Sequence, residues 1–540
     1  MYNVVYNVCI MKSAESCTFS IDIIEGGAGM KKVDAAVVGA GMGGLAAAAV
    51  LAAGGRSVLV CEGSGELGGC AGSFRRSGYL FSAGATYGMG FEPGGLFQRL
   101  YRELGLPLPP LHPQSVIMDV HLPDRTVRYY QQKEAWFREI RRVFPAKAQS
   151  IIDFYEEVFG FSFLLEQIAV HRPVLPPRTF GDAARLLRMV DPRLLKRAPL
   201  LLQSLGQRLR RYGIEREEAF VHFLNGQLID SVQTTADECP VVLAYTALNV
   251  FHRGAYYIDG GLSRIALDLT EAVRSSDGEV RLRTPITGLR KSAGAEGGWE
   301  LRTRRGEIIH AHQVVLGNSL HSFHGLLDEA ERHGGPGFLS QEEEEARPAW
   351  SAFTLYMGCP ADKVFPPVAA DAADQAGAPP VLYHQFIRSY GAPLAETNQF
   401  LLSISRPGDD LRAPAGHAAL TASTHTAPDP WWSLGREAYE RRKQEYADSI
   451  LEGADRVFPG FSDSLDVVLP GTPVTFERYT QRSRGKVGGY IPQGPLDLLR
   501  MSSAYSGVPG VYLCGDTVYP GAGTLGSAMS GWIAAERMLR

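Results

Sequence analysis

The stretch from Ala35 to Gly55 constrains the fold of this chain more than any other, because its 21 residues carry no charge. By length alone, such a run could cross a bilayer as a helix. Glycines divide it, however. Gly39-Ala40-Gly41-Met42-Gly43-Gly44 follows a short apolar run, and Gly54-Gly55 ends a stretch of small residues. These glycines favour a strand, a turn and a helix over a membrane span, so we predict no transmembrane helix.

The sequence around these glycines predicts a nucleotide-binding unit. Residues 33–38 read as a buried strand, residues 45–53 as a helix and residues 56–61 as a second buried strand. In this pattern Gly39 allows the tight turn, Gly41 lets the backbone approach a pyrophosphate, and Gly44 lets helix and strand pack closely. The amide groups at the helix N-terminus, which include those of Met42 and Gly43, favour negative phosphates. We therefore predict that this turn binds a dinucleotide.

Glu62 completes the pattern 23 residues after Gly39. Its carboxylate can accept a hydrogen bond from a ribose 2′-hydroxyl and would repel a 2′-phosphate, which disfavours NADP. The string Gly521 to Gly526 also matches GxGxxG, but only 14 residues follow it. No second strand and acid can complete a unit there, so we predict one dinucleotide site.

Three further blocks resemble those of a known flavoprotein superfamily. Gly68-Gly69 follows Glu62, and with residues 74–86 it is similar to FAD-dependent amine oxidases and carotenoid desaturases. A mid-chain double-glycine block, residues 257–264, precedes residues 279–289, which we interpret as one strand. The resemblance implies that this strand passes the adenine near Ile286. It also implies that Gly515-Asp516 meets the ribityl or pyrophosphate part of FAD, and that a helix starting near Thr524 and Leu525 points at the flavin.

Within the superfamily the chain resembles the phytoene desaturase-like carotenoid desaturases and isomerases. Residues 67–95 and 173–178 are most similar to the C-3′,4′ desaturase branch. Two positions differ from the usual pattern: Cys70 replaces an arginine that many members carry, and Ser82 replaces an aspartate. The resemblance implies an FAD-dependent enzyme that extends the conjugation of an apolar polyene.

The residues predicted to bind the cofactor come from all three parts of the chain. They are Gly39, Gly41, Met42, Gly43, Gly44, Glu62, Gly68, Gly69, Ile286, Gly515, Asp516, Thr524 and Leu525. No side chain stands out as catalytic, because a polyene offers no charge to grip. His310 and His312 have no carboxylate or cysteine at ligand spacing, so we predict surface histidines and no metal site. Tyr479, Arg482 and Arg484 are interpreted as surface or substrate-domain residues.

The spacing of these motifs predicts the domain organisation and an α/β fold. Residues 30–104, 256–319 and 485–540 would form a discontinuous, Rossmann-like FAD-binding domain of the glutathione-reductase type. Residues 105–255 and 320–484 would form an inserted mixed α+β domain that faces the substrate and the membrane. Residues 1–29 show no structural pattern, so they read as a tail or as the result of a start codon placed too early. The seven scattered cysteines indicate no disulfide framework.

The basic stretch from Arg185 to Arg211 is unusual in a chain of net charge −4. Its arginines alternate with leucines, as in helices that lie at a bilayer surface. A surface helix with buried leucines and solvated arginines explains the pattern equally well. A membrane surface is therefore a candidate partner, and the chain would be cytoplasmic and peripheral on the inner face of a membrane. Nucleic acid is not expected, because no aromatic residues for base stacking accompany the basic residues.

Four other functions are compatible with the same motifs. A carotene cis–trans isomerase or a retinol-saturase-like reductase would use the same fold and cofactor, and a flavin amine oxidase would need a polar pocket. A prenyl-binding escort protein would need no chemistry, but such proteins have a degraded cofactor pattern. The glycines and acids of that pattern are intact here.

Overall fold

A computed structural model describes residues 5–6, 21–22, 31–293, 297–322, 324–328, 347–365 and 379–540. Of the predicted tail, residues 1–29, it describes only two short strands. These strands, β1 (Val5–Tyr6) and β2 (Ile21–Asp22), pair in antiparallel fashion. The rest of that prediction lies outside the described residues.

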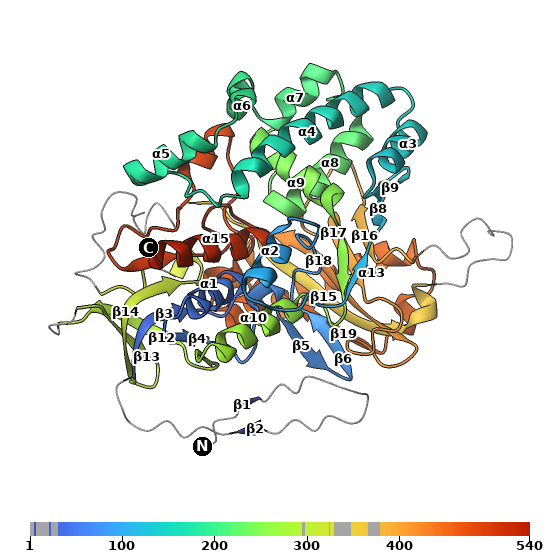
Figure 1. Ribbon diagram of the computed structural model, residues 1–540. Helices are drawn as coiled ribbons and strands as arrows, with labels where there is room; N and C mark the ends of the chain where they lie inside the picture. Colours follow the sequence, from blue (N-terminus) through green and yellow to red (C-terminus); the bar gives the residue numbers. More distant parts are fainter. Residues whose placement is uncertain are drawn as a thin grey trace.

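A seven-stranded sheet forms around the glycine-rich turn (Figure 1). Its order is β11-β4-β3-β14-β13-β12, and β20 pairs with the C-terminal part of β14. Strands β11, β4, β3, β14 and β20 run parallel, whereas β12 and β13 form an antiparallel extension. The strands are β3 (Lys31–Val38), β4 (Val58–Cys61), β11 (Glu279–Arg281), β12 (Ile286–Lys291), β13 (Trp299–Thr303), β14 (Ile308–Leu316) and β20 (Val511–Leu513). This parallel core confirms the predicted Rossmann-like α/β fold.

Helix α1 (Met42–Ala53) is the buried centre of this part of the molecule. It packs between the sheet and two helices, α10 (Ser263–Ser275) and α15 (Gly523–Met538), and α2 (Leu96–Glu103) lies against α15. The crossing with α15 is close because both helices present glycine: a Cβ on Gly531 would lie 1.9 Å from the Gly43 carbonyl oxygen. The uncharged run is therefore helix-on-sheet core. In the part of the chain that the structure describes, no helix is long and apolar enough to cross a membrane.

The predicted single strand over residues 279–289 is wrong, because the chain breaks between β11 and β12. Arg283 adopts φ +52°, and Pro285 has no amide hydrogen for a ladder. The amide of Arg283 donates to the Ser64 carbonyl (2.8 Å) and that of Thr284 to the Glu62 carbonyl (2.7 Å). The break thus holds the start of β12 next to the loop that follows β4.

The two insertions predicted at residues 105–255 and 320–484 share a second seven-stranded sheet, of order β19-β15-β18-β17-β16-β8-β9. The parallel pair β16·β8 joins a strand of the first insertion to one of the second. Helix α13 (Arg436–Asp455) covers one face of this sheet. The strands are β8 (Val116–His121), β9 (Thr126–Tyr130), β15 (Ser351–Pro360), β16 (Tyr383–Ile387), β17 (Gln399–Ile404), β18 (His417–Thr426) and β19 (Val467–Gly471).

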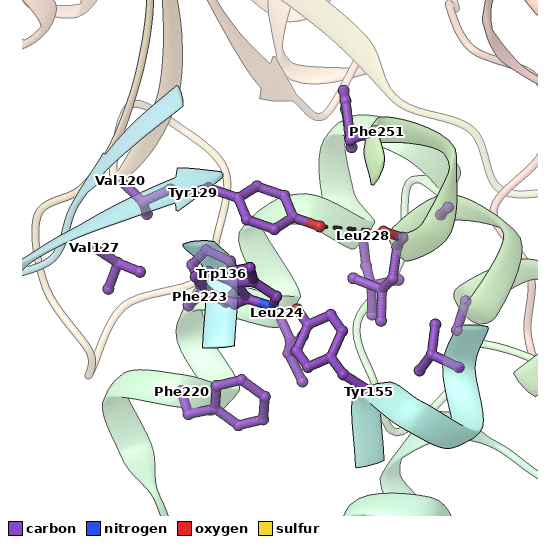
Figure 2. Close-up of a cluster of buried hydrophobic side chains, with 14 of the residues drawn as sticks. Val120, Val127, Tyr129, Trp136, Tyr155, Phe220, Phe223, Leu224, Leu228 and Phe251 are labelled. Atoms are coloured by element: carbon purple, nitrogen blue, oxygen red, sulfur yellow. Dashed lines mark hydrogen bonds between the residues drawn. The ribbon is translucent and has the colours of Figure 1, made fainter. Parts of the chain in front are cut away.

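A helical layer covers one end of this second sheet (Figure 1). Its helices are α3 (Lys133–Val143), α4 (Ala148–Ala169), α5 (Phe180–Met189), α6 (Pro192–Lys196), α7 (Leu205–Tyr212), α8 (Glu218–Val232) and α9 (Val241–Arg253). Aromatic side chains fill the space between the helices and strands β8 and β9, as Figure 2 shows for Tyr129, Trp136, Tyr155 and Phe223. The basic stretch, residues 185–211, is not one helix but is divided among α5, α6, a 3-10 turn (Ala198–Leu202) and α7.

The remaining elements are short. They are β5 (Ser73–Arg76), β6 (Tyr79–Ser82), β7 (Leu111–Pro113), β10 (Tyr256–Ile258), α12 (Pro430–Ser433), α14 (Pro473–Thr480) and 3-10 turns at Gly69–Ala71, Leu320–Ser322, Ala361–Lys363, Ser462–Ser464, Ser483–Gly485 and Pro495–Arg500. Hairpin β5–β6 follows the double glycine and packs against the second sheet through Tyr79 and Phe81.

Candidate cofactor site

The turn between β3 and α1 contains glycines that the fold itself requires and one glycine that it does not. Gly39 has φ +97°, and a Cβ on Gly44 would lie 2.0 Å from the Gly39 carbonyl oxygen, so the protein itself requires glycine at both positions. Gly41 has an ordinary φ of −72°, and a Cβ there would meet no protein atom within 4 Å. The protein alone therefore does not require glycine at position 41, and the turn is open on that side.

Glu62 lies at the end of β4, directly beside this turn. Its Oε2 accepts a hydrogen bond from the Ala40 amide (2.6 Å), and its Oε1 accepts one from the Ser64 amide (2.8 Å). These two bonds fix the carboxylate close to the N-terminus of α1. Ile286, the first residue of β12, follows the segment that is hydrogen-bonded to the Glu62 backbone, so it belongs to the same end of the site.

The double glycine folds back onto the turn. The Gly68 amide donates to the Ala40 carbonyl (2.8 Å), and Gly68 forms an isolated bridge with Gly41. Gly68 and Gly69 both have positive φ, +94° and +59°, and a Cβ on Gly69 would lie 3.4 Å from the Gly41 Cα. The two glycine motifs therefore form one continuous backbone surface.

The C-terminal motif reaches the same place from the far end of the chain. A Cβ on Gly43 would lie 2.9 Å from the Gly515 amide nitrogen, and this amide donates to Ser530 Oγ (2.8 Å). Asp516 is buried next to it. The predicted residues Gly39, Gly41, Met42, Gly43, Gly44, Glu62, Gly68, Gly69, Gly515 and Asp516 thus surround the N-terminus of α1. Thr524 and Leu525 lie farther along, in the first turn of α15, and Leu525 packs against Gly90.

Arg482 is the residue of this site that the sequence interpretation missed. It is not a surface residue: 17% of its side chain is exposed, and it forms a two-pronged ion pair with Asp516, with Nη1–Oδ2 at 2.7 Å and Nη2–Oδ1 at 3.1 Å. Burial alone would raise the pKa of Asp516, but the guanidinium holds that pKa below its ordinary value. Tyr479 and Arg484 are exposed, as expected, and Arg484 pairs with Asp429.

Cys70 lies within electrostatic reach of this ion pair, and its thiol pKa is raised by burial. The thiol therefore stays neutral and supplies no charge to the site. Among the cysteines in the described part of the chain, the thiols of Cys70, Cys239, Cys359 and Cys514 are free.

A cavity of about 160 Å³ extends from the C-terminal motif toward helices α8 and α9. Most of its lining is apolar, and arginine, aspartate and glutamine side chains also contribute to it. The lining residues are Val232, Leu243, Arg347, Pro348, Gly488, Tyr490, Ile491, Pro492, Gln493, Asp497, Arg500, Met501, Asp516, Thr517, Pro520, Gly521 and Ala522.

His310 and His312, for which no metal site was predicted, do not lie in a cluster of possible metal ligands among the described residues. His310 lies 3.9 Å from Glu300 on the neighbouring strand. Within the residues that the structure describes, no group of three or more His, Cys, Asp and Glu side chains could hold a metal ion.

The residues at the α1 N-terminus fit a dinucleotide. The open backbone at Gly41 leaves room for a diphosphate, the helix amides supply donors, and Glu62 is held beside them. A parallel sheet with this turn and an adjoining, largely apolar cavity is typical of a dinucleotide-dependent oxidoreductase.

Comparison with known proteins identifies the family. The chain belongs to the flavin containing amine oxidoreductase family, which matches residues 42–539. It is 26% identical over 521 residues to the prolycopene isomerase of Daucus carota, covering 94% of this chain and 80% of the relative. It is 25% identical over 557 residues to the all-trans-retinol 13,14-reductase of Homo sapiens, covering 94% and 86%. It is 25% identical over 400 residues to a 4,4′-diapophytoene desaturase of Methylomonas sp, covering 71% of each.

A solved structure shows the same fold. Putrescine oxidase bound to putrescine superposes with a TM-score of 0.61 at 15% identity, covering 94% of this chain and 99% of that one. The predictions of an FAD cofactor and of an FAD-dependent oxidoreductase are confirmed by the family.

Proposed function

We propose that FAD binds in an extended conformation along the predicted residues. The adenine end would lie by Ile286 and Glu62, the diphosphate over Gly39 to Gly44, and the ribityl and flavin part between Gly68-Gly69, Asp516 and the start of α15. In this proposal residues 30–104, 256–319 and 485–540 form the cofactor domain, and residues 105–255 and 320–484 form the substrate domain. The convergence of the glycine motifs and Gly515 on the N-terminus of α1 supports this arrangement.

The proposed reaction is desaturation of an apolar, carotenoid-type polyene. The observation that carries it is the largely apolar cavity that begins at Asp516 to Ala522 and ends at Val232 and Leu243. The apolar part of this lining suits a hydrocarbon. The relatives named above, an isomerase of prolycopene, a reductase of retinol and a desaturase of diapophytoene, support a polyene substrate.

The chain's residues would act by binding and orientation. FAD, when bound, supplies a two-electron acceptor for a hydride. Val232, Leu243 and Ile491 would exclude water and hold an allylic carbon of the polyene in the cavity. The amides at the start of α15 would favour negative charge nearby.

The test is expression in cells that accumulate acyclic carotenoids, followed by chromatography of the pigments. We expect products with longer conjugation and a purified protein that is yellow with flavin absorbance. A protein that stays colourless after reconstitution with FAD would favour a prenyl-binding escort protein. Unchanged pigments together with peroxide released from amines would favour an amine oxidase.

Isomerisation is the second candidate, because the prolycopene isomerase aligns over 94% of this chain. An isomerase changes double-bond geometry without net oxidation, and a saturase shortens the conjugation. Anaerobic incubation with chemically reduced FAD separates these activities from desaturation, because a desaturase needs the oxidised cofactor. A cis–trans change under these conditions would replace our first candidate.

We also propose that the surface of α5, α6 and the following 3-10 turn attaches the protein to the inner face of a membrane. Phe180, Leu187 and Leu202 are 97%, 75% and 63% exposed there. Arg185 and Arg188 lie between them, and a groove of about 520 Å³ beside α4 is lined in part by both arginines. Exposed apolar side chains next to cations suit the interface of an anionic bilayer.

Vesicle flotation tests this attachment. The protein should float with phosphatidylcholine vesicles that contain phosphatidylglycerol, and weakly with phosphatidylcholine alone. Charge reversal in R185E/R188E should weaken binding by roughly 30-fold or more, since each cation near the surface contributes about 1 kcal/mol. F180S/L187S should weaken binding to both kinds of vesicle.

The matched control is R436E/R441E on α13, where the arginines are exposed but no apolar side chains of this surface lie beside them. This control should float like the wild type. Equal binding of all variants would mean that another surface, or none, meets the membrane.

A further inference from the structure

Helix α8 carries a partly buried carboxyl group, that of Asp230, which faces the second sheet. Asp230 Oδ2 accepts a hydrogen bond from Gln385 Nε2 (2.6 Å), and Gln399 Nε2 lies 3.0 and 3.1 Å from the two carboxylate oxygens. Within the described ranges, the one ionisable group recorded within ion-pair distance is His425, whose Nδ1 lies 4.0 Å from Asp230 Oδ1. The carboxyl is thus held by neutral amides rather than by a lysine or arginine.

His425 does not neutralise Asp230. Burial lowers the pKa of His425 to about 4, and its Nδ1 has no hydrogen-bond partner, so the ring is neutral near pH 7. Burial also raises the pKa of Asp230 to about 7, against the opposing effect of the two glutamine amides. Burying a carboxyl without a cation is costly, and proteins accept this cost most often at functional sites.

The surroundings of Asp230 include an interior space. The Asp230 side chain keeps 22% of its surface accessible, although Gln385 and Gln399 of the second sheet both hydrogen-bond to its carboxyl group. Leu401, Ser423 and His425 also keep accessible surface, although β17 and β18 are interior strands of the sheet. Leu401 pairs with both Gln385 and Ser423, which places the three side chains on the same face of the sheet. This face, which bears Gln385, contacts α8.

The helix that carries this carboxyl ends at the proposed cofactor site. Two residues after Asp230, Val232 lines the same cavity as Asp516. Gln233 then donates from Nε2 to the Val487 carbonyl (2.8 Å), and the next residue, Gly488, lines the same cavity as Asp516. The end of α8 therefore lies against a segment that shares this cavity with Asp516.

We propose that Asp230 is the proton acceptor for the polyene, an inference that rests on the proposed desaturation. FAD, when bound, would accept a hydride, with its two electrons, from one carbon of the substrate. An ionised Asp230 oxygen takes the proton from the neighbouring carbon. The electron pair of that second C–H bond becomes the new C=C bond, so the carboxyl gains one proton for each double bond formed. Gln385 and Gln399 act as positioning residues that aim the carboxylate.

The experiment is single-turnover mixing of the FAD-loaded protein with a vesicle-borne acyclic carotenoid, read by flavin bleaching at several pH values. The wild-type rate should rise with pH and reach half its maximum near pH 7, because only the ionised carboxyl accepts a proton. D230N should be slower by roughly 100-fold, as expected on loss of a general base, and should lose this pH dependence.

Infrared difference spectroscopy gives a readout that does not depend on activity. A carboxyl band that titrates near pH 7 should be present in the wild type and absent in D230N. D268N is the matched control, because burial also raises the pKa of Asp268, but its partners are Arg264 on α10 and Tyr101 on α2. It should keep the wild-type rate, pH profile and band.

A D230N protein with normal FAD content, rate and pH profile would overturn the inference. Failure of the proposed function looks different: wild-type flavin would not bleach with any polyene, while the infrared titration of Asp230 would persist.

Discussion

Gly41→Val should give a folded protein that does not retain FAD. Because a Cβ at position 41 meets no protein atom within 4 Å and φ is −72°, the backbone accepts a β-carbon there without strain. The valine side chain would occupy the space proposed for the diphosphate. Loss of two charge-assisted hydrogen bonds costs about 3–6 kcal/mol, which corresponds to a roughly 10²–10⁴-fold weaker Kd for FAD. Fluorescence titration of apoprotein with FAD measures the affinity, and thermal melting of apoprotein measures the fold.

Gly44→Ala is the matched comparison, since its Cβ would lie 2.0 Å from the Gly39 carbonyl oxygen. That variant should melt at a lower temperature even without FAD, because helix and strand must move apart. If G41V binds FAD like the wild type, the diphosphate does not lie over this turn. If G41V and G44A are equally unstable as apoproteins, position 41 is constrained by the fold and not by a ligand.

Much of the fold is predictable because its main signals are local. The apolar run of β3, the glycine turn and the small residues of α1 follow one another within 21 residues, and each has one plausible conformation. The break at Arg283 and Pro285 has a local signal in Pro285, which cannot donate to a ladder. The hydrogen bonds that hold the break in place are tertiary, because the backbone there bonds to the carbonyls of Glu62 and Ser64. The sequence also did not predict that the two insertions share one sheet, because the pairing of β8 with β16 joins residues more than 250 positions apart.

In the candidate site, too, the residues with a local sequence signal were predictable and those held by distant contacts were not. The glycines and Glu62 can be identified from their spacing in the sequence. Arg482 cannot, because it lies in a polar stretch with no motif, 34 residues before its partner Asp516. Asp230 did carry a signal. It is the single charged residue after Glu218 in the otherwise apolar and neutral helix α8, and a lone acid in such a helix predicts either a buried partner or a function.

Arg482→Met should destabilise the apoprotein by about 3–5 kcal/mol, because it leaves the buried Asp516 carboxylate without its cation. It should also weaken FAD binding, since Asp516 then loses the contact that orients it. R484M is the matched control, because Arg484 is half exposed and pairs with Asp429 at the surface. Its melting temperature and FAD affinity should stay close to those of the wild type.

The loss of stability in R482M should depend on pH, in a direction that follows from the pKa of Asp516. In the wild type the pKa of Asp516 lies below its ordinary value of 3.8, so the pair stabilises the fold above that pH and the contribution is lost as the pH falls. In R482M the guanidinium no longer opposes the effect of burial, which raises this pKa, so the variant should lose stability as the pH rises toward neutrality. The difference between the two proteins should therefore be small in acid and large near pH 7. R482M/D516N, which buries no charge at either position, should recover most of the apoprotein stability without recovering FAD affinity. A single variant that melts like the wild type at every pH would show that the ion pair is not a stabilising element of the site.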